Sequence, residues 1–307
     1  MSKIGHNKPP IALDPKETIK KNIRRRKLIV DNGISLFKGV PLPTWIELSL
    51  IDVCNRSCSF CPKADDKIAP DTYQKMSKKL IDKLHDDLKK MKFKGSLALC
   101  GYGEPLLHKD IEYIVDKLSR VADIEIVTNG DPLNQKIIKK LYNANAARLL
   151  ISMYDGPEQI EFFEKMILKT GLDKNKFYLR PHWVGYHKNW GLFLNNRSGL
   201  VTSEENEYLK PLEASKSRRC FYPFYKMFID YNGDVLFCSN DWGRKIIVGN
   251  INDTSIYEIW TSEKLNKIRQ KLSKKDRNFA PCNTCSINGE LHGEKSFQIF
   301  EKLNILK

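Results

Sequence analysis

The stretch CNRSCSFCP, residues 54–62, places three cysteines within eight positions: Cys54, Cys58 and Cys61. Three thiols this close in sequence cannot all pair as disulfides. The C-x3-C-x2-C spacing instead supplies three thiolates from one loop, and thiolates select soft metals and iron–sulfur clusters. Three ligands leave one position open, and an open position in a metal centre generally indicates chemistry. The alternative is a structural zinc site that borrows Cys100 or a histidine.

The composition is that of a chain with a sizeable core. It has 307 residues, 41% of them hydrophobic, which suits one large domain or two smaller ones. No signal peptide and no apolar run of about 18 residues is visible, so we expect a cytoplasmic protein with reduced thiols. In that compartment clustered cysteines indicate metal binding or catalysis rather than disulfides.

A basic stretch near the N-terminus, IKKNIRRRKLIV at residues 19–30, is the densest source of the formal net charge of +15. We predict an amphipathic helix with a solvated charged face and with Ile19, Ile23 and Leu28 against the body of the protein. A nucleic-acid arm, or a site for an acidic or phosphate-bearing partner, is the alternative interpretation of this charge.

Strand and helix patterns alternate at least five times between residues 44 and 184, which predicts parallel βα units in a barrel, a partial barrel or a doubly wound sheet. The pattern changes after about residue 200. There the stretch FYKMFIDYNGDVLFC, residues 224–238, carries Asn232-Gly233 between alternating apolar residues and predicts a β-hairpin. Residues 255–272 then predict one helix or two short ones. We therefore expect a second, smaller module in this part of the chain.

Four further cysteines lie in or beside this module, as Cys220, Cys238, Cys282 and Cys285. Four thiolates complete a tetrahedral set, so their spacing alone is compatible with zinc. Cys100 lies in an apolar strand, and we expect it to be a buried thiol of the core.

Two motifs follow the first cysteine loop in order: GYGEP at residues 101–105 and TNG at residues 128–130, each where a predicted strand ends. Together with the C-x3-C-x2-C loop they resemble the radical S-adenosylmethionine (SAM) superfamily over about residues 45–200. One glycine of the family's Gly-Gly-Glu-Pro turn is replaced here by Tyr102. The resemblance implies an α/β fold with a partial (β/α)6 TIM-like barrel, whose sites lie at the carboxyl ends of the strands.

The resemblance also implies cofactors and ligands. Cys54, Cys58 and Cys61 would hold a [4Fe–4S] cluster whose open iron is chelated by SAM. A donor such as flavodoxin or ferredoxin would reduce it, and cleavage of SAM would give a 5′-deoxyadenosyl radical that abstracts hydrogen from the substrate. The implied SAM-binding residues are Phe60, Gly101, Gly103, Glu104, Thr128, Asn129, Ser152 and Arg180.

The C-terminal region resembles the SPASM/Twitch modules of the same superfamily, through FIDYNGDVLFCSND, VGNINDTSIYEIWTSEKLNKIR and CNTC. Four cysteines imply the truncated Twitch form, with Cys220, Cys238, Cys282 and Cys285 fully ligating one auxiliary [4Fe–4S] cluster. The cluster arrangement is similar to that of a radical SAM aminocyclitol dehydrogenase. We divide the chain into a basic N-terminal extension (1–44), a radical SAM barrel (45–205) and a SPASM/Twitch module (206–307).

The favoured hypothesis is oxidation of a sugar, aminocyclitol or other polyol, with the auxiliary cluster accepting an electron. Asn196 and Arg197 are the candidate catalytic residues, with Arg197 orienting the substrate because of its high pKa. Peptide or protein modification, including epimerisation, is an alternative, although about 44 residues before the first barrel strand are few for a leader-binding domain. The others are a nucleotide-linked or nucleic-acid substrate and a zinc-stabilised binding module. We expect Trp183, Trp190 and Trp242 to serve packing.

Overall fold

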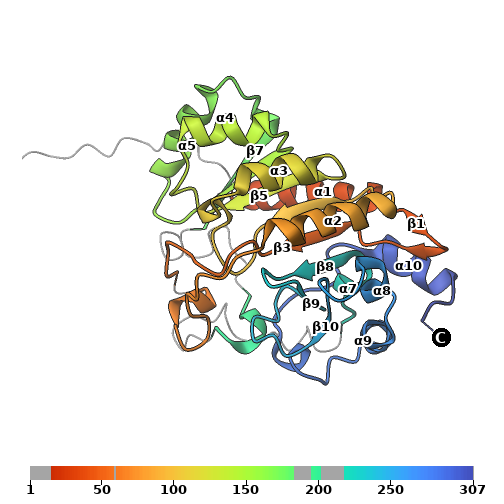
Figure 1. The fold of residues 1–307 in the computed structure, drawn as a ribbon. Helices are drawn as coiled ribbons and strands as arrows, with labels where there is room; N and C mark the ends of the chain where they lie inside the picture. Colours follow the sequence, from red (N-terminus) through yellow and green to blue (C-terminus); the bar gives the residue numbers. More distant parts are fainter. Residues whose placement is uncertain (1–14, 59, 183–194, 202–217, 307) are drawn as a thin grey trace, which may run out of the picture.

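The computed structural model describes residues 15–58, 60–182, 195–201 and 218–306 (Figure 1). Trp183 and Trp190 lie outside the described residues, as does the part of the N-terminal extension before residue 15. Within the described ranges, no helix has both the length and the apolar composition needed to cross a membrane.

A single large sheet organises the fold. Its eight strands run in the order β10-β9-β8-β3-β4-β5-β6-β7. Strands β3 to β7 are neighbours, pair in parallel and follow chain order, which confirms the predicted α/β class with a partial barrel. These strands are β3 (Trp45–Leu48), β4 (Ser96–Leu99), β5 (Asp123–Thr128), β6 (Arg148–Met153) and β7 (Phe177–Pro181).

The predicted hairpin at Asn232-Gly233 is present, formed by β8 (Lys226–Ile229) and β9 (Asp234–Leu236). It is not confined to a separate module, because β8 pairs in parallel with β3 and so extends the barrel sheet. Strand β10 (Ile247–Asn250) adds antiparallel to β9. The sixth parallel strand therefore comes from the C-terminal region and lies at the β3 side of the sheet, opposite β7.

Four helices connect the parallel strands and pack their apolar faces on the outer side of the sheet. They are α2 (Lys78–Lys90), α3 (Ile111–Ser119), α4 (Gln135–Asn143) and α5 (Glu158–Leu168). In α2, Leu80, Leu84 and Leu88 recur at a spacing of four and are buried. They join the outward-facing strand residues, such as Ile46 and Leu97, in one continuous core. This packing leaves the opposite strand residues to line the barrel interior.

The C-terminal helices are α7 (Tyr222–Tyr225), α8 (Ile256–Trp260), α9 (Glu263–Ser273) and α10 (Glu294–Lys302). The predicted segment 255–272 is two helices because each begins at its own capping serine. Ser255 forms a capping box with Glu258, and Ser262 accepts from the backbone N–H of Leu265. The short elements are β1 (Leu36–Phe37), β2 (Val40–Pro41), η1 (Pro62–Ala64), η2 (Pro105–Leu107), η3 (Lys174–Lys176), η4 (Arg197–Gly199) and η6 (Cys282–Thr284).

The basic N-terminal stretch forms the predicted helix, α1 (Pro15–Asn32), and Ile23 faces the body of the protein as predicted, but the predicted burial of Leu28 is wrong. Leu28 is 61% exposed, whereas two of the arginines turn toward the sheet. Arg25 pairs with Glu125 of β5, and Arg26 lies 3.2 Å from Glu47 of β3. Figure 1 shows α1 behind the strands, on the side opposite α2 and α3. The arginines turn inward because these strand carboxylates, inside a barrel, need cationic partners.

Candidate active site

A cavity of about 530 Å³ occupies the barrel interior. Residues from the first cysteine loop, from β3 and β5 to β8 and from the turn after β4 line it, together with residues of α1 and of the C-terminal region. Several of these residues follow the carboxyl ends of parallel strands, where α/β barrels carry their active sites. The cavity lining includes Cys54, Cys58, Phe60, Cys61, Gly101, Gly103, Glu104, Thr128, Asn129, Ser152, Arg180 and Arg197.

The three thiols of the first loop face this cavity together. Burial is the main cause that raises the pKa of Cys58 to about 11, and the neighbouring sulfurs of Cys61 and Cys54 add to it. The side-chain amide of Asn129 lies 3.8 Å from the sulfur of Cys54 as a donor. Across the ranges that the structure describes, no three Cys, His, Asp or Glu side chains converge tightly enough to share one metal ion. Three soft donors around one cavity fit an iron–sulfur cluster, which spans more space than a single ion.

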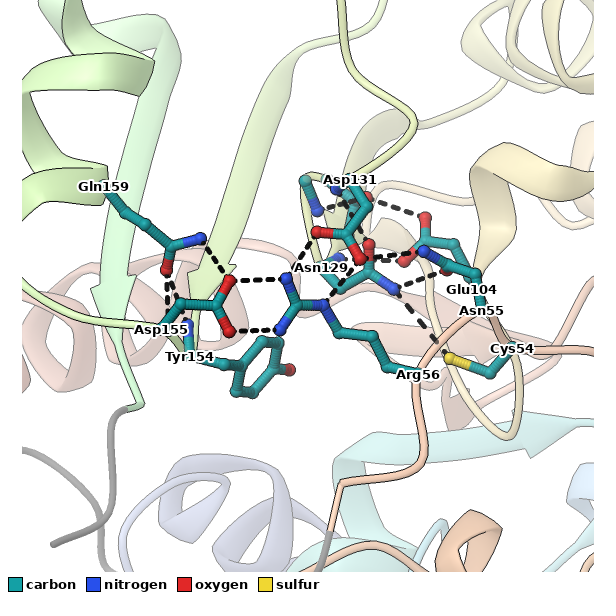
Figure 2. Close-up of polar contacts among 11 residues, drawn as sticks. Cys54, Asn55, Arg56, Glu104, Asn129, Asp131, Tyr154, Asp155 and Gln159 are labelled. Atoms are coloured by element: carbon teal, nitrogen blue, oxygen red, sulfur yellow. Dashed lines mark hydrogen bonds and ion pairs between the residues drawn. The ribbon is translucent and has the colours of Figure 1, made fainter.

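An arginine in the middle of the cysteine loop fastens it to two strand ends (Figure 2). The guanidinium of Arg56 donates two bonds of 2.6 Å to Asp131 and two bonds of 2.7 Å to Asp155. Asp131 follows β5, and Asp155 follows β6 and is held in turn by Gln159. Bidentate pairing raises the pKa of Arg56 further and lowers that of Asp155. The loop that carries the thiols is thus attached to the strands that carry the predicted SAM ligands.

The two sequence motifs after the loop are bonded to each other through Glu104. Its carboxylate accepts from the hydroxyl of Thr128 at 2.7 Å and from the backbone N–H of Asn129 at 2.8 Å. It also accepts from the backbone N–H of Leu106, so that it begins η2. Burial nevertheless raises the pKa of Glu104. An ammonium group in the cavity would restore the favourable environment of its ionised form.

The GYGEP turn runs so close to the neighbouring backbone that two of its positions admit only glycine. A Cβ at Gly103 would lie 2.2 Å from the carbonyl oxygen of Ile51, and Gly101 has a φ of +125°. Tyr102 between them lines the same cavity, and its hydroxyl donates to the carbonyl of Asp241 at 3.0 Å. Its ring also packs on Trp242, with centroids 4.1 Å apart. The residue that departs from the family's glycine therefore joins the barrel to the C-terminal region.

The remaining predicted SAM ligands line the same cavity. Arg180 on β7 donates to the hydroxyl of Ser152 on β6 at 2.6 Å, because the two residues are register partners. Phe60 stacks on Tyr154 with a centroid distance of 5.6 Å. His182, which sequence reasoning missed, also lines this wall, and its Nδ1 is buried without a hydrogen bond. Burial, and then the charges of Arg180 and Arg197, lower the pKa of His182 well below its usual range.

The second set of cysteines surrounds a separate cavity of about 20 Å³. Cys220, Cys238, Cys282 and Cys285 all line it, although 65 positions separate the first from the last. Burial raises the pKa of Cys220 to about 11 and that of Cys238 to about 12. Backbone N–H groups point at two of the sulfurs: Asn240 at Cys238 and Ile287 at Cys285. Four thiols with N–H donors fit a fully ligated iron–sulfur cluster.

The two cavities lie next to each other. Tyr222, Asn240 and Ile287 line both of them, so these side chains form the wall between the barrel interior and the four-cysteine cavity. The wall explains why the C-terminal hairpin joins the barrel sheet. Pairing of β8 with β3 brings Cys238 and the residues around it against the barrel.

The structure separates the two predicted catalytic residues. Arg197 lines the barrel cavity and lies 5.9 Å from the ring of Trp242, and its Nε is buried without a hydrogen bond. Asn196 is fully buried and bonds with the loop of the last two cysteines, donating to the carbonyl of Thr284 at 2.7 Å and accepting from the N–H of Ser286 at 3.1 Å. This burial favours a structural role for Asn196, and its contact with the substrate stays a prediction.

One further expectation needs correction, and two residues of the cavity were missed. Cys100 is only half-buried and lines the barrel cavity, so it is not a thiol enclosed in the core. The end of the cavity near α1 carries Glu47 and Lys226, which sequence reasoning did not single out. Strand alternation contains the signal for both, since Glu47 is the only acidic residue in TWIELSLI and Lys226 interrupts an apolar strand. Trp242, in contrast, is buried against Tyr102 as expected, although it also reaches the cavity.

Comparison with known families decides between the alternatives. The model of the radical SAM superfamily matches residues 48–174, and that of the SPASM iron–sulfur cluster-binding domain matches residues 220–286. This chain belongs to the radical SAM superfamily. As a radical SAM enzyme it uses a [4Fe–4S] cluster and SAM, and the SPASM domain implies an additional auxiliary iron–sulfur cluster.

Several characterised proteins are similar to this radical SAM enzyme. It is 28% identical over 253 residues to the SAM-dependent 2-deoxy-scyllo-inosamine dehydrogenase of Niallia circulans, covering 80% of this chain and 94% of that protein. It is 29% identical to the GTP 3′,8-cyclase of Thermodesulfovibrio yellowstonii over 43% of this chain and 41% of that one. Among solved structures, BtrN in complex with AdoMet and 2-DOIA aligns with a TM-score of 0.69 at 24% identity, covering 83% of this chain and 97% of that one. This last likeness confirms the fold.

Proposed function

We propose that this enzyme oxidises a hydroxyl-bearing carbon of a sugar or polyol to a carbonyl. The observation that carries the proposal is the shared wall of Tyr222, Asn240 and Ile287 between the two cavities. Oxidation of a carbon radical needs an electron acceptor close to the substrate, and the four-cysteine cavity provides a place for one. The 28% identity to a dehydrogenase that acts on an aminocyclitol supports the same reaction type.

The cofactors supply the radical that removes a hydrogen atom and the site that accepts one electron, while the chain positions the reactants. Glu104 is suited to accept from the ammonium group of SAM, and Arg180 with Ser152 to bind its carboxylate and ribose. Glycine at 101 and 103 lets the backbone approach this ligand closely. We also assign Phe60, Thr128 and Asn129 to this half of the cavity, where they lie with Glu104.

The substrate would occupy the rest of the cavity. Arg197 presents a buried Nε that makes no hydrogen bond, which suits it to orient a substrate oxygen. His182 is held neutral by burial between Arg180 and Arg197, and its unbonded nitrogen can accept from a substrate hydroxyl. We therefore infer that Arg197 orients the substrate and that neutral His182 accepts a hydrogen bond from its hydroxyl group. Asn196 acts as a positioning residue for the loop of Cys282 and Cys285.

The balance of this reaction requires an external one-electron donor, and we assign that role to a flavodoxin or ferredoxin. One electron enters to cleave SAM, and the substrate gives up a hydrogen atom, a proton and one electron. No disulfide joins any of the eight cysteines, all of which lie in the described residues, and we assign the enzyme to a reducing compartment such as the cytoplasm, where thiolates remain available to clusters. We regard residues 45–205 as the SAM-binding unit and residues 206–307 as the auxiliary-cluster unit, built on one sheet.

The test is anaerobic reconstitution with iron and sulfide, followed by incubation with SAM, a reductant and pools of polyols and sugars. We expect about eight iron atoms per chain and formation of 5′-deoxyadenosine that rises when a substrate is added. The organic product should be two mass units lighter than its substrate. Zinc without sulfide, or 5′-deoxyadenosine formation that persists after Cys54, Cys58 and Cys61 are all replaced by alanine, would refute the proposal.

One observation favours a second candidate, epimerisation of the same class of substrate. Cys100 lines the barrel cavity, and burial raises its pKa well above that of a free thiol, so it carries a hydrogen atom at neutral pH. Donation of that atom to the opposite face of a substrate radical would invert the carbon, and one electron and one proton would restore the thiol. Reaction in D₂O distinguishes the two, because an epimer gains one deuterium and Cys100→Ala prevents its formation.

A further inference from the structure

We propose that the substrate of this enzyme carries an anionic group, a carboxylate or a phosphate, which binds to a cationic site at the α1 end of the barrel cavity. This proposal rests on the proposed function, because it concerns the molecule that the same cavity would oxidise. The site consists of Arg26 from α1, Lys226 from β8 and His292 from the turn before α10, all of which line the cavity.

The charges at this end do not cancel. Glu47 is the acidic residue of the site, and Arg26 and Lys226 both pair with it, at 3.2 and 2.7 Å. The indole N–H of Trp45 donates to the same carboxylate at 3.1 Å. These neighbours, Lys226 foremost, lower the pKa of Glu47 against the opposing effect of burial. With Glu47 ionised, two cations face one anion, and a net positive charge remains beside the cavity.

Hydrogen-bonding capacity at this end is also unused. Nε of Arg26 and Nδ1 of His292 are both buried and make no hydrogen bond. His292 is only 7% exposed, and burial together with Arg26 and Lys226 lowers its pKa to about 3, so the ring is neutral. Buried polar atoms without partners are rare in folded proteins. An anion in the cavity would supply acceptors for the guanidinium and for the imidazole.

The site is distinct from the half of the cavity assigned to SAM. Along the sheet, Glu47 lies level with Arg148 on β6, through the register of β3, β4 and β5. Ser152, which pairs with Arg180, is four residues further along β6, or about 13 Å at 3.3 Å per residue. The SAM carboxylate assigned to Arg180 therefore does not account for these cations.

The same arrangement disfavours a substrate that carries an amino group beside Glu47. An ammonium group that approached Glu47 would meet Arg26 and Lys226, which already neutralise that carboxylate. Helix α1 is held in place for this role, since Lys295 of α10 pairs with Asp31 of α1 at 3.3 Å and Arg25 pairs with Glu125. Helix α1 of the basic extension thus contributes Arg26 to the substrate site inside the barrel.

The test compares the binding of neutral, anionic and cationic ligands, within each set of which the ring is similar and the charge differs. Isothermal titration of the reconstituted enzyme, with SAM present and reductant omitted, would use myo-inositol, myo-inositol 1-phosphate and scyllo-inosamine, with D-glucuronate and D-glucose as the carboxylate pair. We expect one anionic ligand to bind at least about tenfold more tightly than its neutral counterpart, since each tenfold step needs only about 1.4 kcal/mol. Preference between inositol phosphate and glucuronate identifies the anionic group.

Charge variants then locate the site. Arg26→Gln should lower the affinity ratio of anionic to neutral ligand by about tenfold. Glu47→Gln should raise this ratio, because the substitution leaves both cations unopposed. Arg24→Gln, an exposed position on the same helix, is the matched control and should change nothing. Equal binding of neutral and anionic ligands, tighter binding of scyllo-inosamine, or an unchanged preference in both Arg26→Gln and Glu47→Gln would overturn the proposal. SAM cleavage without substrate, measured on the same samples with reductant, tests the proposed function separately.

Discussion

Replacement of Asn196 by alanine tests whether this residue belongs to the structure around the second cysteine set or to the chemistry of the cavity. Its side chain makes two hydrogen bonds with the loop of Cys282 and Cys285, one to the carbonyl of Thr284 and one from the N–H of Ser286. Asn196 is completely buried, so no water replaces the lost contacts without rearrangement. We expect the variant to be less stable and to hold the auxiliary cluster poorly.

The magnitude follows from the two contacts. Loss of the bond to Thr284, a partly exposed contact, costs about 1 kcal/mol, and an unpaired buried N–H at Ser286 costs about 1–3 kcal/mol. The sum is about 2–4 kcal/mol, which for a chain of this size lowers the thermal midpoint by about 3–6 °C. The effect should fall on the loop first, because η4 and η6 are joined through these bonds.

The assay combines thermal unfolding with iron and sulfide analysis and with the optical spectrum of the reconstituted protein. Wild type should hold about eight iron atoms per chain, and Asn196→Ala should approach four, with SAM cleavage in the absence of substrate retained. Asn278→Ala, an exposed position in the same region, should stay within about 0.5 kcal/mol of wild type. If Asn196→Ala keeps full iron content and full stability but loses turnover, Asn196 acts on the substrate and the structural reasoning is wrong.

Four other changes test separate parts of the site. Gly103→Ala should prevent SAM binding in equilibrium dialysis, since its Cβ would meet backbone carbonyls, whereas Gly243→Ala, whose Cβ would make only ordinary van der Waals contacts, should not. Arg56→Gln should accelerate loss of iron to a chelator, because four hydrogen bonds that hold the cysteine loop disappear. Tyr102→Gly, which restores the family's glycine, should destabilise the protein by about 3–5 kcal/mol in denaturant titrations by leaving a cavity. Stability should fall as pH drops from about 6.5 toward 3, because the unfolded chain binds a proton at His292 while the folded chain, with a pKa of about 3, does not; His292→Phe should flatten that decline.

Much of this organisation was predictable from local sequence signals. The C-x3-C-x2-C loop, GYGEP and TNG each combine a fixed spacing with a strand end, so their assembly around one cavity follows from parallel βα topology alone. The hairpin at Asn232-Gly233 and the two capping serines are likewise local signals, read within a few residues. For this reason sequence reasoning could predict the two sets of cysteines that the structure brings to the two cavities.

The rest depended on contacts that no local pattern encodes. The Asn232-Gly233 turn predicts that β8 and β9 pair with each other. It does not predict that β8 also pairs with β3. Helical periodicity placed Leu28 inward because it counts apolar residues, whereas Arg25 and Arg26 turn inward to meet carboxylates on distant strands. Asn196 and Arg197 were predicted together because their stretch resembles the family's, yet Arg197 lines the barrel cavity while Asn196 bonds to the loop of Cys282 and Cys285.

The pairing of β8 with β3 has a consequence for how the chain is made. Thr44 and Tyr225, which hydrogen-bond beside this pair, are 181 positions apart in the sequence. At about 5–20 residues per second, the free edge of β3 waits roughly 10–40 s on the ribosome for its partner. An unpaired strand edge is a template for aggregation, so shortened chains that end before β8 should associate rather than fold. The hairpin that leads to Cys238 is therefore also the protection of the barrel's edge, and the enzyme can complete its fold only when its second cysteine site is assembled.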